Sequence, residues 1–221
     1  MNKLTSLQLL GINERYSKRL IAYGIDPKTL GWSSLEQQFI RFNRFADYLP
    51  SRFNSIIDIG CGFGDFATYL TFVEKPPESY LGIDINPDLI TVASSKEYQF
   101  PAHFLCGDLL DNSFFEVVNR ERSCIIIASG VFNLNFNNSM SLMETFLFDM
   151  LGQMINLKPD RVIIDFVPLQ RIDVYNSEDY IAMYDLNAII SFLTEKKLKY
   201  IIDLSQDPNP MSEALLVINF S

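Results

Sequence analysis

The sequence is poor in the residues that hold metal ions, disulfides or nucleic acids. Its 221 residues include three cysteines, none in a Cys-x-x-Cys pair, and one histidine, His103. The odd cysteine count favours a reducing compartment and argues against a disulfide framework or a zinc site, so we expect no bound metal. Its 18 lysines and arginines are outnumbered by 27 acidic residues, for a net charge of −9. Because binding to a nucleic-acid backbone requires clustered cations, we expect no nucleic-acid partner.

A long apolar run is missing as well. The longest stretch without a charged residue, from Ser123 to Met143, contains four asparagines and a glycine. It therefore predicts a strand followed by a polar loop rather than a membrane span. The stretch from Met1 to Leu20 has too short an apolar segment for a secretory signal. We expect a cytoplasmic protein that acts on a small molecule, as a monomer or homodimer, without a membrane partner.

An alternation of short strands and helices begins near residue 55. Helical patterns lie near residues 65–74, 88–97, 113–120, 139–156 and 179–196. The expected strands are Ser55–Ile59, Tyr80–Asp84, His103–Cys106, Cys124–Ala128, Arg161–Phe166, Tyr200–Leu204 and Leu215–Phe220. This order predicts an α/β fold with a doubly wound, Rossmann-like, seven-stranded and mostly parallel sheet. Only a turn at residues 207–210 separates the last two strands, so we expect an antiparallel C-terminal hairpin.

The first fifty residues are helical in pattern. Ser33 to Glu36 has the form of a helix-capping box. One helical face then carries Leu35, Phe39, Phe42, Ala46 and Leu49, until Pro50 ends the helix. We expect residues 1–50 to form an N-terminal helical cap and residues 51–221 to form a cofactor-binding domain.

A glycine-rich turn follows the first expected strand, in the segment Asp58 to Asp65 (DIGCGFGD). Glycines between a first strand and its helix allow a ligand to approach the backbone closely. The dinucleotide fingerprint Gly-x-Gly-x-x-Gly would require its third glycine where Asp65 stands. This departure weakens the case for an NAD enzyme and favours a cationic cofactor without a diphosphate.

Acidic residues stand at the ends of the next two strands. Asp84 ends the second expected strand, and Asp108 follows the third. A carboxylate at the first of these positions can accept hydrogen bonds from both hydroxyls of a ribose. A carboxylate at the second can accept one from the amine of an adenine. The glycine turn, Asp84 and Asp108 therefore predict together a cofactor that contains adenosine.

These segments resemble the class I S-adenosylmethionine-dependent methyltransferases, and the resemblance covers residues 55 to 220. It implies S-adenosylmethionine as the cofactor, with the glycine turn beneath the methionine part and the end of the fourth strand near the sulfonium. It implies Asp84 at the ribose and Asp108 at the adenine. The cofactor-binding residues implied in this way are Asp58, Gly60, Cys61, Gly62, Gly64, Asp84, Ile85, Asp108, Leu109, Ser129 and Gly130.

A narrower likeness covers nearly the whole chain. It is carried by Arg15-Tyr16, Gly31-Trp32-Ser33-Ser34, Gln38, Arg41-Phe42 and the run from Ala128 to Asn133. These segments are similar to those of a little-characterised bacterial subgroup of the same enzymes, which tends to have isoleucine where this chain has Val131. Members of that subgroup have no assigned substrate, so the likeness leaves the acceptor open.

Four residues outside the main motifs are candidates for the site. Arg41 could bind the methionyl carboxylate of the cofactor, because a guanidinium matches a carboxylate bidentately; the alternative is a solvated arginine on the outer helix face. Trp32 could close over the ligand, although a core position is favoured. Tyr16 could belong to a lid or simply pack. Asp165, at the end of the fifth strand, could orient or deprotonate the acceptor or merely cap the rim.

Two segments are expected to shape the acceptor pocket. One is the polar run of residues 133–138, and the other is Pro168 to Tyr184, which carries Arg171, Tyr175 and Tyr180. No catalytic dyad is recognisable, so the catalytic residues are left unassigned.

The expected function is methyl transfer from S-adenosylmethionine to an oxygen or nitrogen of a small-molecule acceptor. Such a reaction chiefly needs alignment and exclusion of water, because the cofactor already carries the reactive group. The alternatives are a non-catalytic module that binds S-adenosylmethionine and an aminopropyl-type transferase on the same fold.

Overall fold

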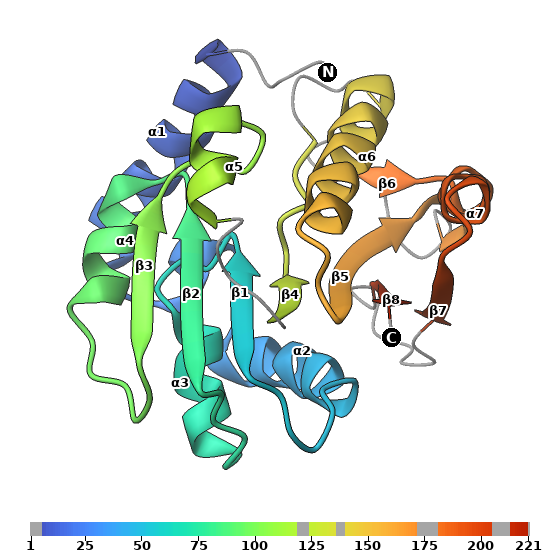
Figure 1. Cartoon of the computed structure of the whole chain (residues 1–221). Helices are drawn as coiled ribbons and strands as arrows, with labels where there is room; N and C mark the ends of the chain where they lie inside the picture. Colours follow the sequence, from blue (N-terminus) through green and yellow to red (C-terminus); the bar gives the residue numbers. More distant parts are fainter. Residues whose placement is uncertain (1–5, 119–123, 136–139, 172–180, 205–212, 221) are drawn as a thin grey trace.

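The chain folds around one mostly parallel sheet, as the sequence predicts (Figure 1). The computed structural model describes residues 6–118, 124–135, 140–171, 181–204 and 213–220. The strands lie in the order β3-β2-β1-β4-β5-β8-β7, and β6 pairs with β5 outside this path. Their bounds are β1 Ser55–Ile59, β2 Ser79–Asp84, β3 Ala102–Cys106, β4 Cys124–Ala128, β5 Arg161–Pro168, β6 Met183–Tyr184, β7 Lys199–Leu204 and β8 Ala214–Asn219. Because β8 runs antiparallel to both β5 and β7, the expected C-terminal hairpin is confirmed.

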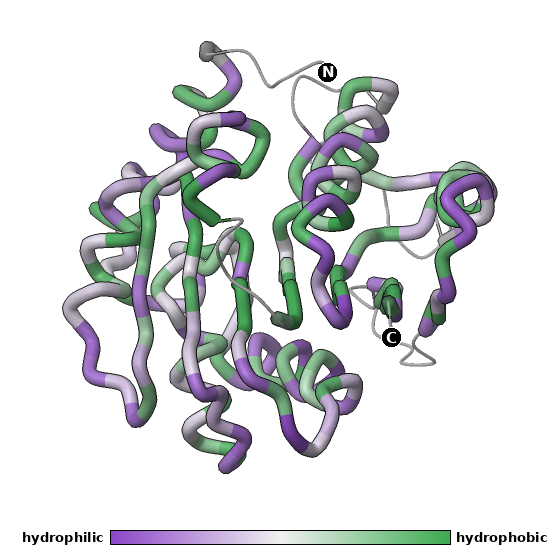
Figure 2. Tube along the Cα trace, in the orientation of Figure 1, coloured by the Kyte–Doolittle hydropathy of each residue, from purple (hydrophilic) through white to green (hydrophobic). Residues whose placement is uncertain are grey.

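Helices cover both faces of this sheet. Their bounds are α1 Ser6–Tyr23, η1 Pro27–Leu30, α2 Leu35–Asp47, α3 Asp65–Phe72, α4 Pro87–Ser94, α5 Asn112–Val118, α6 Met140–Asn156, η3 Leu169–Arg171 and α7 Leu186–Glu195. Ile57 of β1 belongs to an apolar cluster that includes α6, whereas its neighbour Ile56 belongs to a second cluster with α2 and α3. Strands β1 and β4 are buried along their whole length, as expected for strands covered on both faces. Figure 2 shows β4 in the green of hydrophobic residues. No helix in the described residues is long and apolar enough to cross a membrane.

Helix α2 packs the N-terminal segment against the sheet. The Ser34 side chain accepts a hydrogen bond from the backbone N–H of Gln37 at 3.2 Å, so the helix begins where the capping box predicts. Phe42 and Phe45 are buried among residues of β1 and α3. Leu35 was expected on the same buried face, but it lies in the first turn of the helix and is 52% exposed.

The helical stretch expected at residues 179–196 begins later than the sequence pattern suggests. Residues 179–180 lie outside the described residues, and Met183–Tyr184 form the short strand β6, parallel to β5. Asp185 then caps α7, because its side chain accepts a hydrogen bond from the N–H of Asn187 at 2.9 Å. The cap fixes the start of the helix at Leu186, and the chain before it pairs with β5 instead.

Candidate functional site

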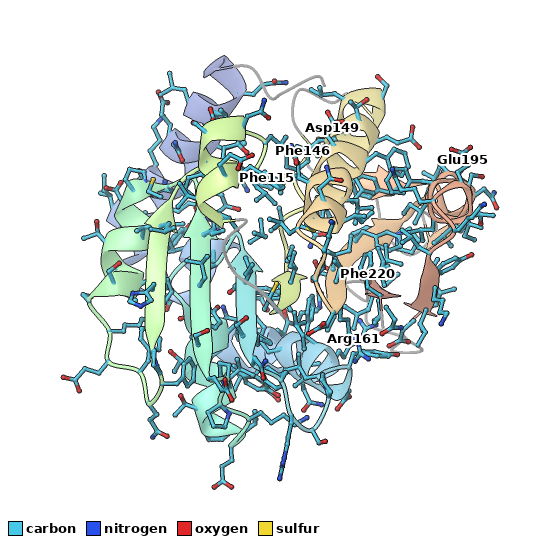
Figure 3. All side chains as sticks on the ribbon, in the orientation of Figure 1. Phe115, Phe146, Asp149, Arg161, Glu195 and Phe220 are labelled. Atoms are coloured by element: carbon cyan, nitrogen blue, oxygen red, sulfur yellow. The ribbon has the colours of Figure 1, made fainter. Side chains whose placement is uncertain are left out.

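Two adjoining cavities open where β1, β2 and β4 end. The first is lined by the glycine turn after β1, the turn after β4 and the N-terminal segment from α1 to α2. The second lies between the end of β2 and the segment after β3. Both cavities are lined by Gly60, Asp84, Val131 and Phe146, the last of which Figure 3 labels on α6. A ligand that extends across these strand ends could therefore occupy both.

Most of the expected cofactor-binding residues lie at these cavities. The first cavity is lined by Asp58, Gly60, Cys61, Gly62, Asp84, Ser129 and Gly130. The second is lined by Gly60, Asp84, Ile85, Asp108 and Leu109. Gly64 and Arg41 line neither of them. Gly64 instead caps α3, and a β-carbon there would lie 2.4 Å from the hydroxyl of Tyr98.

The glycine turn is held against β2 by backbone hydrogen bonds. The N–H groups of Gly60 and Cys61 both donate to the carbonyl of Ile83, at 2.7 and 3.0 Å. Gly60 has a φ of 72°, and a β-carbon on it would lie 2.4 Å from Cγ2 of Val131. Both the backbone conformation and the close side chain therefore require glycine at this position.

Asp84 is fixed at the junction of the two cavities. Its carboxylate accepts hydrogen bonds from the backbone N–H of Gly62 at 3.0 Å and of Asn86 at 2.9 Å. Burial raises the pKa of Asp84, against the opposing effect of these hydrogen bonds. The carboxylate is thus oriented by the backbone and retains acceptor capacity for a ligand.

Asp58 is buried at the end of β1 and lines the first cavity. It accepts a hydrogen bond from the hydroxyl of Tyr80. Burial raises the pKa of Asp58 from 3.8 to about 7, and the Tyr80 hydrogen bond opposes that rise. The protonation state of this carboxyl therefore changes close to neutral pH.

The N-terminal segment contributes aromatic side chains to the first cavity. Tyr16 of α1 lines it, and burial together with the charge of Asp84 raises the pKa of Tyr16 to about 12. Trp32 is half-buried and also lines the cavity. The preference for Trp32 as a core anchor was therefore wrong, because its ring contacts Phe42 and Arg41 at the cavity and does not belong to an apolar cluster.

Gln38 also lines the first cavity, and no motif in the sequence predicts a function for it. It is 1% exposed and lines the first cavity, and its Nε2 donates to Oδ2 of Asp65 at 3.0 Å. Because that carboxylate accepts hydrogen bonds only, the amide must present its nitrogen to Asp65. The Oε1 atom of Gln38 then has no hydrogen-bond partner. The only signal for this residue was its place in the segment shared with the bacterial subgroup.

Arg41 lies behind the cavity wall rather than in it. It is 7% exposed, so it is not the solvated arginine of the alternative interpretation. Its guanidinium forms ion pairs with Asp165, at 2.6 Å, and with Glu213. Asp165, which the sequence suggests as a group that orients or deprotonates the acceptor or merely caps the rim, is fully buried and lines neither cavity. The arginine was considered as a partner for a ligand carboxylate, and in the structure it binds two carboxylates of the chain.

The segments expected to shape the acceptor pocket are described only in part. Leu134 lines the first cavity, whereas residues 136–139, Tyr175 and Tyr180 lie outside the described residues, as does the Arg171 side chain. Tyr184 is buried, and its hydroxyl donates to the carbonyl of Phe132 at 2.8 Å. Tyr184 therefore supports the turn after β4 from the core.

The side chains with carboxyl, ammonium or guanidinium groups that line the first cavity in the described residues are all acidic. Asp58, Asp65 and Asp84 line it, and no lysine or arginine does so within the described residues. Lys96 lies nearby but binds Asp65 at 2.8 Å. The described residues contain no group of three or more histidine, cysteine and acidic side chains that could hold a metal ion. The cavity thus suits a ligand that carries positive charge and donates hydrogen bonds.

Residues 57–120 match a family model described as a methyltransferase domain. No curated protein matches the sequence. Among solved structures, the chain is similar to the magnesium protoporphyrin IX methyltransferase of Synechocystis PCC 6803 with bound S-adenosylhomocysteine. The identity is 15%, the TM-score is 0.60, and the match covers 97% of this chain and 100% of that one. A methyltransferase dependent on S-adenosylmethionine from Anabaena variabilis is similar at 14% identity with a TM-score of 0.63, over 96% of this chain and 94% of that one. At these identities the structural similarity concerns the fold.

Proposed function

We propose that this chain is a class I S-adenosylmethionine-dependent methyltransferase and that it transfers the methyl group to an oxygen or nitrogen of a small molecule. The first cavity carries this proposal. It adjoins the second cavity at Asp84, and its lining combines three carboxylates with Tyr16 and Trp32. A cavity with this lining suits an acceptor of limited size that is neutral or cationic. The segments that contain Tyr16, Trp32 and Gln38 also carry the likeness to the bacterial subgroup, and we propose that the chain belongs to that subgroup.

The residues at the cavities fit the cofactor. We propose that Asp108 and Leu109 bind its adenine, that Asp84 binds its ribose, and that residues 58–64 lie along its methionyl part. The unpartnered Oε1 of Gln38 supports this placement, because the α-ammonium of that part is a donor. When bound, the cofactor supplies an electrophilic methyl group on a sulfonium. The chain then aligns the acceptor and excludes water, with residues 1–50 as the proposed helical cap.

The proposal can be tested without knowing the acceptor. Purified protein is incubated with S-adenosylmethionine labelled in its methyl group and with a cell extract, which is then separated into small molecules, nucleic acids and proteins. We expect the label in the small-molecule fraction. Label in nucleic acid or protein would contradict the proposal. Binding of the cofactor without transfer to any fraction would favour the non-catalytic alternative.

Replacement of Gln38 should weaken binding of the methionyl part of the cofactor and leave the nucleoside part unaffected. We expect Gln38→Leu to lower the affinity for S-adenosylmethionine about tenfold, because a hydrogen bond from a charged donor is lost. Affinity for 5′-methylthioadenosine, which lacks the amino-acid part, should change little. Calorimetric titration of each ligand measures both constants.

Gln37→Leu is the matched control for this prediction. Gln37 is next to Gln38 on α2, bonds to Ser33 and lines neither cavity. Its replacement should leave both affinities unchanged. Equal weakening of the two ligands by Gln38→Leu would show that Gln38 supports the cavity without recognising the ammonium group.

A further inference from the structure

Two parts of the wall of the first cavity face each other without belonging to any helix or strand. Trp32 precedes α2, and Gly130 follows β4. Atom Cζ2 of Trp32 lies 3.8 Å from the point that a β-carbon on Gly130 would occupy. Gly130 has a φ of 75°, and both residues line the cavity. Their positions therefore depend on contacts outside regular secondary structure.

A cluster of three buried charges lies behind these two residues. Arg41 of α2 binds Asp165 of β5 at 2.6 Å and also pairs with Glu213, which directly precedes β8. The side chains of the three residues are at most 8% exposed. The guanidinium carbon of Arg41 lies 5.4 Å from the ring centroid of Trp32. The indole is therefore held on the face of the same arginine that joins the two carboxylates.

The two carboxylates in turn hold the chain that follows β4. Asp165 accepts a hydrogen bond from the backbone N–H of Gly130 at 2.7 Å and one from the hydroxyl of Ser129 at 3.4 Å. Glu213 accepts one from the side-chain amide of Asn133 at 2.8 Å. One cluster thus contacts both the segment before α2 and the turn after β4, although these are distant in sequence.

We propose that Arg41, Asp165 and Glu213 are positioning residues, which hold Trp32 and Gly130 in place at the methyl-transfer end of the cofactor site. Buried ion pairs contribute little net stability, because desolvation offsets the attraction. Fixing the geometry of the cavity is therefore the better account of this cluster. The proposal rests on the methyltransferase function, and it assigns to Arg41 a role that needs no direct contact with the cofactor.

Asp165→Asn tests the cluster with little change of volume. The carboxylate of Glu213 remains to pair with the guanidinium of Arg41. The new amide oxygen can still accept the hydrogen bond from the N–H of Gly130, but the negative charge that pairs with Arg41 is lost. We expect acrylamide quenching of Trp32, the sole tryptophan, to rise about twofold as the local contacts loosen. Affinity for S-adenosylmethionine should fall about fivefold, whereas affinity for adenosine, which reaches only the nucleoside part, should be retained.

Asp203→Asn is the matched control. Asp203 of β7 pairs at 3.5 Å with Arg44, which lies on α2 like Arg41. Asp203 lines neither cavity, so loss of its charge should alter neither the quenching nor the affinities. Equal weakening of both ligands by Asp165→Asn, or unchanged quenching in the folded variant, would overturn the proposal. If that variant does not fold, Glu213→Gln removes the other carboxylate and should raise the quenching in the same way; unchanged quenching there would also overturn it. A wild-type protein that binds neither ligand would instead refute the methyltransferase function.

Discussion

Asp84→Ala should lower the affinity for S-adenosylmethionine about a hundredfold, or roughly 3 kcal/mol. The carboxylate is held by the N–H groups of Gly62 and Asn86, at 3.0 and 2.9 Å, and it stands where the two cavities meet. We expect its remaining acceptor capacity to bind the two ribose hydroxyls. Truncation would remove those charged hydrogen bonds and also release Gly62. Calorimetric titration of the wild type and the variant measures the loss.

The ribose itself supplies a sharper form of the same test. Wild-type protein should prefer adenosine to 2′,3′-dideoxyadenosine, and Asp84→Ala should bind the two nucleosides equally well. Glu195→Gln is the control, since Glu195 is exposed on α7, away from the cavities, where Figure 3 labels it. If the preference for adenosine survives in Asp84→Ala, the carboxylate does not bind the ribose.

Asp84 also illustrates what can be predicted from the sequence. The end of a parallel strand is a position that hydrophobic patterning locates to within a residue or two, and the carboxyl ends of neighbouring parallel strands meet at one edge. The glycine turn, Asp84 and Asp108 can therefore be placed together from the order of the residues alone. Each of these residues lies at the end of a strand, and the hydrophobic pattern of that strand is visible in the sequence.

The charged cluster behind the cavity could not be predicted in this way. Arg41, Asp165 and Glu213 come from three distant parts of the chain, and periodicity does not indicate which buried arginine meets which carboxylate. The position of Trp32 was wrongly predicted for the same reason, because this residue lies before α2 and contacts Arg41, a neighbour that no helical periodicity indicates. The short strand β6 was missed because two residues carry no recognisable pattern.

Asp58 makes the stability of the protein depend on pH near neutrality. Its pKa is 3.8 in the unfolded reference and about 7 in the folded chain, where burial disfavours the charged form. The folded state therefore holds the proton more tightly. The stability that this group contributes is fully present below pH 3.8 and is lost as the pH rises through about 7. The dependence has the opposite sign to that of a carboxylate stabilised by a salt bridge.

Asp58→Asn should remove this dependence, since the amide cannot ionise and its oxygen can still accept from the Tyr80 hydroxyl. Between about pH 5 and 7 the wild type should lose roughly 3 kcal/mol from this group, at about 1.4 kcal/mol per pH unit. For a chain of this size that corresponds to a fall of roughly 5–10 °C in melting temperature, which Asp58→Asn should not show.

Thermal unfolding between pH 5 and 7, without cofactor, compares the wild type with Asp58→Asn, and the control Glu195→Gln should follow the wild type. Because Asp84 and other groups titrate in both proteins, the difference between the two curves isolates Asp58. Parallel curves would mean that Asp58 is already ionised at acidic pH, and that the interior of the site is more polar than its burial implies.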